Sequence, residues 1–267
     1  MHGRPHPGRW QPWCASLLFG LALAGVWPAA SAAPAADRPL KILVYGGTGM
    51  IGSRIVAECL RRGDHVMVAV RHPPHAGALP AAVRFEQADV LDAADVDRQI
   101  AGEDVVIEAV SARAGRSPGQ PAVGAGLPAM QGAHFYRRVA QNLVAAARRL
   151  GPKAPRLLFV GGASTLYDSD HTLLLDEIPG LSRNSEFYMM KEALDYLRSV
   201  ADVSWTVLTP ALQIAPGERT GRFRLGRDSL VRDAHGRSRI SAEDFAVAML
   251  DEVHHPEHVR ERFTLGY

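Results

Sequence analysis

The fold is decided by one stretch of sequence, which reads LKILVYGGTGMIG at residues 40–52. Its first half is a continuous apolar run, as expected for a parallel strand that is covered on both faces. Its second half carries Gly46, Gly49 and Gly52 in a Gly-x-x-Gly-x-x-Gly pattern and opens a helical pattern. A strand, a glycine-rich turn and a helix in this order predict a dinucleotide-binding unit.

Each glycine of this pattern has its own physical task. Gly46 permits the sharp turn, Gly49 lets the backbone approach a pyrophosphate, and Gly52 allows the helix and the strand to pack closely. The helix N terminus then presents unpaired N–H groups and a positive dipole end to the phosphates. The predicted phosphate-binding residues are Gly46, Gly47, Thr48, Gly49, Met50, Ile51 and Gly52.

The remaining sequence alternates short strands with helices, which predicts an α/β protein with a Rossmann-type, doubly wound parallel sheet and helices on both faces. The expected strands are 40–45, 65–70, 83–87, 105–110, 156–160 and 205–209, and the expected helices are 51–62, 93–101, 134–150 and 186–200. A small C-terminal extension is expected as well. It comprises a hairpin over 222–233, a helix from Ser241 to Val253, and an edge strand at 262–266.

The N-terminal residues do not follow this pattern. Arg4 and Arg9 precede an apolar run at 15–27, and Ala30-Ser31-Ala32 follows it, which is the three-part layout of a secretory signal peptide. The alternative is a start codon placed too far upstream of a cytoplasmic enzyme. We expect a signal peptide at 1–32, a linker at 33–39 and a single NAD(P)-binding domain at 40–267. The protein is then periplasmic or secreted if the signal is genuine, and cytoplasmic otherwise.

Charge and cysteine content narrow the function classes. Removal of residues 1–32 takes away two arginines and no acids, so Lys+Arg falls from 30 to 28 against 28 Asp+Glu. A neutral chain argues against a general binder of nucleic acids or anionic membranes. Beyond Cys14 only Cys59 remains, so an intramolecular disulfide is excluded. We expect no stable membrane span, and the oligomeric state stays open.

The end of the second strand predicts which dinucleotide is bound. Many NAD-specific sites place an acidic residue there for the 2′-hydroxyl of the adenosine ribose, whereas this chain has Arg71. A guanidinium suits a 2′-phosphate by charge and by forked geometry. NADP is therefore favoured, with NAD still possible and Arg54 as a candidate to assist. The alternative is that Arg71 is a solvated loop cation.

Further cofactor contacts are expected where the later strands end. Asp89 and Val90 follow the third strand, where such folds contact adenine, although Asp89 could equally belong to the N-cap region of the next helix. Ala109 and Val110 end the fourth strand beside the switch point of the sheet. Pro210 follows the sixth strand and is expected to hold the carboxamide.

Several runs of sequence together resemble a known family. The loop at 46–52 resembles the atypical short-chain dehydrogenase/reductase superfamily. Four further runs, at 160–164, 209–211, 216–221 and 262–267, resemble the NADH-flavin reductase group of this superfamily. That group is close to the NmrA-like and biliverdin-reductase-B-like proteins. The resemblance spans residues 40–267, and 216–221 is its most specific piece. It implies an extended Rossmann core and a reduced nicotinamide that faces a planar electron acceptor, such as a quinone or a flavin bound as substrate.

Orthodox short-chain dehydrogenases use a Tyr-x-x-x-Lys pair as their acid. Here Phe187 stands four positions before Lys191, and Tyr188 stands only three before it. Because i,i+3 neighbours share a helix face, Tyr188 and Lys191 are candidate catalytic residues, although this spacing does not guarantee the geometry. Ser111 and Ser164, at the ends of adjacent central strands, are candidates for the pocket wall near the nicotinamide. An ordinary turn hydroxyl is the alternative for Ser164.

The departure from that pair predicts the type of reaction. Hydride transfer to a flavin needs no tyrosine acid, because a ring nitrogen accepts the hydride and the proton can come from water. An NAD(P)H-dependent reductase of a small-molecule acceptor is therefore favoured. The alternatives are a non-catalytic NAD(P)-binding sensor or scaffold, and an epimerase- or dehydratase-like enzyme that would need a working Tyr188–Lys191 pair. The substrate-side elements are expected mainly in 161–185 and 211–240.

Two further features invite a functional interpretation. The Gly-, Pro- and Ala-rich segment at 111–132 predicts a long loop beside the nucleotide site. His254, His255 and His258 suggest a metal site, but their position at a helix end favours surface histidines that complement the helix dipole. No metal is expected.

Overall fold

The structure is a computed structural model that describes residues 38–72, 80–112, 134–168, 170–183 and 185–267. The chain divides into two units, Met1–Arg38 and Pro39–Tyr267, and every helix and strand named here belongs to the second. The expected signal peptide at 1–32, the linker up to residue 37, and residues 113–132 of the expected loop lie outside the described residues.

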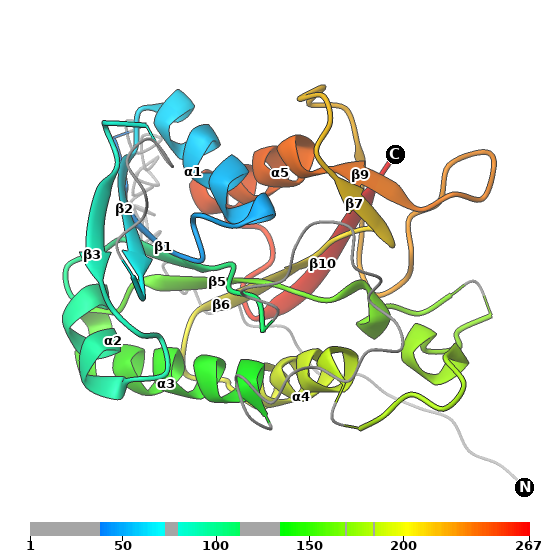
Figure 1. Ribbon diagram of the computed structural model, residues 1–267, viewed down its shortest axis with the longest axis horizontal. Coiled ribbons are helices and arrows are strands. Elements are labelled where there is room, and N and C mark those ends of the chain that lie inside the picture. Colours follow the sequence, from blue (N-terminus) through cyan, green and yellow to red (C-terminus); the bar gives the residue numbers. More distant parts are fainter. Residues whose placement is uncertain (1–37, 73–79, 113–133, 169, 184) are drawn as a thin grey trace, which may run out of the picture. The chain divides into compact units, whose positions relative to one another are not determined.

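In the described part of the chain, the second unit is built on an eight-stranded sheet of order β3-β2-β1-β4-β5-β6-β10-β8 (Figure 1). Its strands are β1 (Lys41–Tyr45), β2 (His65–Val70), β3 (Arg84–Gln87), β4 (Val105–Glu108), β5 (Arg156–Val160), β6 (Trp205–Thr209), β8 (Arg224–Gly226) and β10 (Glu261–Gly266). A separate parallel pair consists of β7 (Gln213–Ala215) and β9 (Arg239–Ser241).

Helices cover both faces of this sheet (Figure 1). They are α1 (Met50–Arg62), α2 (Ala93–Ile100), α3 (Phe135–Leu150), α4 (Glu186–Arg198) and α5 (Ala242–His254), with short 3-10 turns η1 (Gly151–Lys153), η2 (Ala163–Thr165) and η3 (Leu174–Glu177). Helices α1 and α5 lie on one face, and α2, α3 and α4 lie on the other. The predicted doubly wound parallel sheet is therefore confirmed. Among the described residues, no helix is long and apolar enough to cross a membrane.

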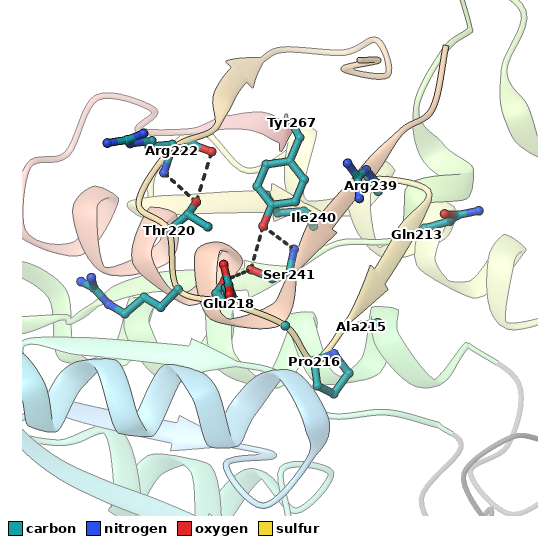
Figure 2. Close-up of a pocket in the computed structure, with 12 residues that line it drawn as sticks. Gln213, Ala215, Pro216, Glu218, Thr220, Arg222, Arg239, Ile240, Ser241 and Tyr267 are labelled. Carbon is teal, nitrogen blue, oxygen red and sulfur yellow. Dashed lines mark hydrogen bonds between the residues drawn. The ribbon is translucent and has the colours of Figure 1, made fainter. Parts of the chain in front are cut away.

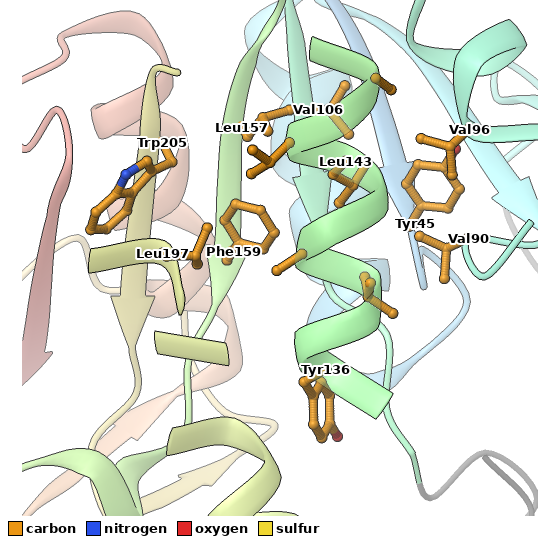
Figure 3. Packing of buried hydrophobic residues seen from close by; sticks show 14 of the residues in the cluster. Tyr45, Val90, Val96, Val106, Tyr136, Leu143, Leu157, Phe159, Leu197 and Trp205 are labelled. Atoms are coloured by element: carbon orange, nitrogen blue, oxygen red, sulfur yellow. The ribbon is translucent and has the colours of Figure 1, made fainter. Parts of the chain in front are cut away.

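The face covered by α3 shows why these residues form a helix against this sheet. Leu143 of α3 packs among Val106 of β4, Leu157 of β5 and Tyr45 of β1 (Figure 3). The apolar residues of α3 recur at helical spacing, so one side of the helix is buried and the other carries its arginines. The central strands β1, β4, β5 and β6, covered on both faces, are correspondingly rich in apolar residues.

The C-terminal extension differs from the expectation in two respects. Residues 222–233 form no hairpin; only β8 is a strand, and it pairs antiparallel with β10. Because β8 takes the outer position, β10 lies between β6 and β8 and is not the edge strand. Val231 packs against Gly226 and Gly266, so the alternating apolar residues of this segment reflect packing onto β10, not pairing within a hairpin.

The segment 216–222, called the strap, is held by a buried carboxylate, that of Asp244 in the first turn of α5. Asp244 is 0% exposed and accepts hydrogen bonds from the Thr220 hydroxyl (2.6 Å), the Gly221 N–H (2.7 Å) and the Tyr267 hydroxyl (2.8 Å). Figure 2 shows Tyr267 also bonded to Ser241, the N-cap of α5. One carboxylate thus joins the strap, the helix and the C-terminal residue.

A second buried carboxylate joins the same segment to α1. Glu58 is 3% exposed and receives two hydrogen bonds from Arg219, each of 2.8 Å, as well as ion pairs from Arg61 and Arg62. Burial alone would raise the pKa of Glu58, but the hydrogen bonds from Arg219 and Arg62 outweigh it and lower the pKa to about 2. Arg219 therefore pins the strap to the helix that begins at the glycine loop.

We predict that Asp244→Ala lowers the free energy of unfolding by about 3 kcal/mol, because three donors lose their acceptor in a buried site. Asp251→Ala on the same helix is the matched control. Its carboxylate is 54% exposed and pairs with Arg62, so its loss should stay within about 1 kcal/mol. Urea denaturation of both variants measures the difference, and equal losses would contradict this role of Asp244.

Candidate functional site

The glycine loop is built by close backbone approaches. Gly46 has a φ of +78°, and a Cβ placed on it would lie 2.3 Å from the carbonyl oxygen of Ala109. A Cβ on Gly52 would lie 2.2 Å from the carbonyl oxygen of Gly46. Both positions therefore exclude any side chain, as the sequence predicted for the turn and for the packing of helix on strand.

The N terminus of α1 faces outward from this turn. Gly49 is its N-cap residue and supplies no side-chain hydrogen bond, and the first turn contains no acidic residue. Thr48 and Gly49 are exposed, and Met50 is 42% exposed. The first N–H groups of the helix are thus free of carboxylate competition and accessible, so the loop fits the pyrophosphate of a dinucleotide.

The neighbouring strand ends meet at the same edge of the sheet. Tyr45, the last residue of β1, lies beside Ala69 of β2 and beside Glu108 of β4, and Glu108 lies beside Phe159 of β5. Because β2 and β4 flank β1, the strand order reverses at β1, which is where doubly wound sheets bind their ligands. The predicted cofactor residues Ala109 and Val110, which follow β4, and Pro210, which follows β6, are thereby brought to this edge.

The residues predicted for the adenosine end lie on the β2–β3 side. Arg71 follows β2 and is exposed, while Arg54 is engaged by an ion pair of 3.1 Å with Glu243 of α5. Asp89 follows β3, and its carboxylate accepts the Leu91 N–H at 2.9 Å. Asp92, not Asp89, is the N-cap of α2.

Val90 beside Asp89 is 5% exposed and belongs to the core cluster under α3. Its carbonyl accepts the side-chain amide of Asn142 at 3.0 Å. The Val90 side chain is therefore buried in the core and does not project toward the predicted adenosine site.

Two buried hydroxyls mark the ends of β5 and β6. Ser164, in the turn after β5, is 6% exposed, and Thr209, the last residue of β6, is 0% exposed. Neither hydroxyl has a hydrogen-bond partner within the described residues. The Thr209 hydroxyl lies 2.5 Å from the position that a Cβ on Gly161 would take. Sequence reasoning selected Ser164 and missed Thr209; its signal was a threonine directly before Pro210 at the end of an apolar strand. Ser111 is exposed beside the same edge.

The structure does not bring Tyr188 and Lys191 together. The Lys191 ammonium pairs with Asp195 one turn further along α4 at 2.5 Å, and the Tyr188 ring lies under the Arg183 guanidinium at 5.5 Å. In the described part of the chain, no hydrogen bond joins these two side chains. Each is engaged by another residue, although the i,i+3 spacing places both on neighbouring positions of α4.

A buried acidic cluster lies on the α3–α4 side of the same edge and was not predicted. Glu108 ends β4 and is 4% exposed, and burial raises its pKa to about 8, against a smaller lowering by the Val110 N–H. The Tyr136 hydroxyl of α3 donates to the Glu186 carboxylate of α4 at 2.6 Å. Burial, and then Glu186, raise the pKa of Tyr136. The signal in the sequence was a single Glu that closes an otherwise apolar strand.

A second concavity lies apart from the glycine loop. It is a groove of about 1050 Å³ along the β7–β9 pair and the strap 216–222, with Arg222, Arg239 and Tyr267 among its lining residues (Figure 2). It shares no lining residue with the ends of β1, β4 and β5. Most of its lining residues belong to the predicted substrate-side segment 211–240.

The histidines near the C terminus are structural. His254 pairs with the buried Asp64 at 3.0 Å, and His258 pairs with the buried Glu252 at 2.8 Å. They are partly buried, so the expectation of surface histidines is wrong for these two: each contributes to packing through a buried acid. Only His255 is exposed. Among the described residues, no group of three or more His, Cys, Asp and Glu side chains is placed to hold a metal ion.

Comparison with known proteins identifies the family. The model of the family described as NAD(P)H-binding matches residues 46–256. The chain belongs to the NAD(P)H-binding family. This agrees with the resemblance to the atypical short-chain dehydrogenase/reductase superfamily and with the Rossmann-type sheet.

Three solved structures are similar to this NAD(P)H-binding protein over most of its length. A "putative exported protein" of Burkholderia pseudomallei is 38% identical, with a TM-score of 0.69, over 85% of this chain and 100% of that one. A "putative epimerase" of Bacteroides thetaiotaomicron is 31% identical, with a TM-score of 0.71, over 86% and 98%. A "putative NADH-flavin reductase" of Streptococcus pneumoniae is 26% identical, with a TM-score of 0.67, over 85% and 99%. Their names include both a reductase and an epimerase, so similarity alone does not select the reaction.

The burial of Glu108 predicts a specific dependence of stability on pH. Its pKa is about 8 in the folded protein and near 4.5, the ordinary glutamate value, in the unfolded chain. Between these values the unfolded chain ionises and the folded protein does not, so the free energy of unfolding falls as pH rises from 4.5 to 8, by up to about 1.4 kcal/mol per pH unit. Below and above this window the contribution is flat.

Urea denaturation across pH 4 to 9 measures this slope. Glu108→Gln removes the titrating group, so the difference between wild type and variant should change across the window and be constant outside it. A pH-independent difference would contradict the assignment.

Proposed function

We propose that this protein is an NADPH-dependent reductase that transfers hydride from the nicotinamide to a planar small-molecule acceptor, such as a quinone or a flavin bound as substrate. The observation that carries the proposal is the combination of an accessible, acid-free helix N terminus at the glycine loop with a separated Tyr188–Lys191 pair. The first binds the dinucleotide, and the second argues against chemistry that depends on a tyrosine acid.

The residues that would hold the dinucleotide follow the sheet edge. The loop 46–52 and the N terminus of α1 bind the pyrophosphate, and Arg71 binds the 2′-phosphate through its forked guanidinium. The backbone at Ala109 and Val110 and the residues from Pro210 onward hold the nicotinamide half. When bound, the reduced nicotinamide supplies the hydride.

The chain's own contribution near the nicotinamide is orientation and exclusion of water. The hydroxyls of Ser164 and Thr209, buried and without a partner in the described residues, are available to a ligand that reaches the ends of β5 and β6. A buried hydroxyl without a partner is costly, so a ligand that accepts from it or donates to it recovers a hydrogen bond. Orientation of this kind suffices for hydride transfer.

Two alternatives make different predictions. A sensor or scaffold would bind NADP(H) with no turnover. An epimerase- or dehydratase-like enzyme would need Tyr188 to exchange a proton, so Tyr188→Phe would abolish its activity. The separation of Tyr188 from Lys191 favours the reductase over the second alternative.

For localisation we propose that residues 1–32 are a cleaved signal peptide, which the name of the Burkholderia relative supports. N-terminal sequencing of the mature protein tests this. An exported reductase must carry its dinucleotide with it, because free NADPH is a cytoplasmic pool. Tight retention of NADP during purification is therefore expected if the signal is cleaved.

The central experiment is stopped-flow oxidation of NADPH by the purified protein with a benzoquinone, a naphthoquinone, FMN and riboflavin. Turnover of at least one acceptor is expected, and Tyr188→Phe should retain it within about twofold, since hydride transfer to these acceptors does not pass through that phenol. Absence of turnover across the panel, with NADPH bound, would favour the sensor. Loss of turnover in Tyr188→Phe would favour a tyrosine-dependent enzyme.

Arg71→Ala tests the preference for NADPH. We expect its Kd for NADPH to rise about 10- to 100-fold, the value of a charge-assisted contact to phosphate, while its Kd for NADH stays unchanged. Arg84→Ala is the matched control, because Arg84 is an exposed arginine at the opposite end of the neighbouring strand β3. Isothermal titration calorimetry measures the Kd values of both variants. An equal effect on the Kd for NADPH and for NADH would contradict binding of the 2′-phosphate by Arg71.

A further inference from the structure

Glu108 is a buried carboxyl group with very little to stabilise its charge. It ends an apolar strand, is 4% exposed, and accepts one hydrogen bond, from the Val110 N–H at 3.0 Å. No lysine, arginine or histidine of the described residues forms an ion pair with it. A carboxylate in such surroundings loses its hydration without compensation, so the group retains its proton at neutral pH, in line with its raised pKa of about 8.

A protonated carboxyl group is a hydrogen-bond donor, and Glu108 faces a space in which it can donate. A cavity of about 30 Å³ lies between α4 and the sheet, lined by Glu108, Tyr136, Gly161, Gly162, Thr165 and Met190 among others. That volume is about the share of one water molecule. The cavity extends from Glu108 to the backbone after β5, next to the buried hydroxyl of Thr209.

Tyr136 lines the same cavity as Glu108. Its hydroxyl accepts the Ala112 N–H at 3.0 Å and donates to Glu186 at 2.6 Å. Glu186 lies in the first turn of α4, where the helix dipole favours a carboxylate. The two acids therefore have opposite environments: Glu108 is held neutral by burial, and Glu186 is supported by a phenol and a helix N terminus.

The titratable groups around Glu108 come from three elements. Tyr136 belongs to α3 and Glu186 to α4, and Tyr45 is its register neighbour on β1. The residues of α4 that line the cavity, Met190 and Leu194 among them, are apolar.

We infer that Glu108 is the internal proton source of the proposed reductase, and that its acceptors are quinones or other conjugated carbonyl compounds. The inference rests on the proposed function. The acceptor takes up a hydride from the reduced nicotinamide, and one of its carbonyl oxygens gains the electron pair. The O–H bond of Glu108 breaks, a proton passes through one water in the cavity, and a new O–H bond forms on the product. Solvent returns a proton to Glu108, so NADPH, one proton and a quinone give NADP⁺ and a hydroquinone.

The acceptor class follows from the need for that proton. A carbonyl oxygen that becomes a hydroxyl in a closed site requires a donor within reach. A flavin accepts hydride at a ring nitrogen and can take its proton from water. Glu108 therefore matters for carbonyl acceptors and is dispensable for flavins.

The test compares wild type, Glu108→Gln and Glu103→Gln. Glu103 is the matched control, because it precedes the opposite end of β4 and burial raises its pKa too. With a naphthoquinone, kcat of wild type and Glu103→Gln should fall as pH rises above 8. Glu108→Gln should have a kcat about 100-fold lower, the usual contribution of a positioned acid, with no decline near pH 8. KM, the NADPH Kd and the FMN rate should be unchanged.

Carboxyl ¹³C NMR of the glutamate-labelled protein without dinucleotide gives a readout that does not depend on turnover. One signal should titrate near pH 8 in wild type and be missing in Glu108→Gln. Tyr136→Phe, which keeps the ring and removes the hydroxyl, provides a second variant should Glu108→Gln fold poorly. Its naphthoquinone kcat should fall with KM unchanged.

The outcomes separate the two proposals. Unchanged quinone kcat and pH profile in Glu108→Gln, or a Glu108 signal that titrates at the ordinary glutamate pKa while wild type turns over, would overturn the inference and leave the reductase intact. An FMN rate that falls as much as the quinone rate would overturn the assignment of acceptor class. Wild type that binds NADPH and reduces no acceptor overturns the proposed function, and the inference with it.

Discussion

The contact on which the site depends is between backbone atoms: the carbonyl of Gly46 lies where a Cβ on Gly52 would have to be, and Ala109 presses on Gly46 in the same way. Three segments thus meet without side chains. Because the segments approach so closely, α1 begins directly after the end of β1. Its N terminus, which has no side-chain cap, lies at the edge of the sheet. The fit of this point to an anion is therefore a consequence of packing, because the same glycines that let helix and strand touch leave the helix N–H groups exposed.

The far end of the chain stabilises this geometry. Arg219 binds Glu58 in the middle of α1, and Asp244 of α5 binds the strap and Tyr267. Helices α1 and α5 share one face of the sheet. The run 216–221, the most specific part of the family resemblance, thus has a structural reason: its polar groups donate hydrogen bonds to two buried carboxylates.

The face covered by α3 and α4 contains a polar residue at the end of an apolar strand, Glu108 of β4. Glu108 lies where the apolar core ends and the ligand-binding edge begins, so its carboxyl group is desolvated and yet adjoins a cavity. The Tyr136–Glu186 hydrogen bond closes this region from α3 and α4. The strand order and the placement of the helices thus bring β4, α3 and α4 together at the sheet edge.

The sequence by itself determined the strand–turn–helix of 40–62, the parallel sheet, and the residues at its edge, because glycine spacing and apolar periodicity are local signals. It also indicated that Tyr188 and Lys191 stand at an unusual spacing. Only the tertiary structure decided that Lys191 pairs with Asp195, that residues 224–226 pair with β10 and form no hairpin, and that His254 and His258 serve buried acids. Pairings across distant segments depend on which partner the fold brings within reach. The raised pKa of Glu108 is likewise decided by the tertiary structure. Its burial and the adjoining cavity arise only when the chain is folded, and a single glutamate in a sequence indicates neither.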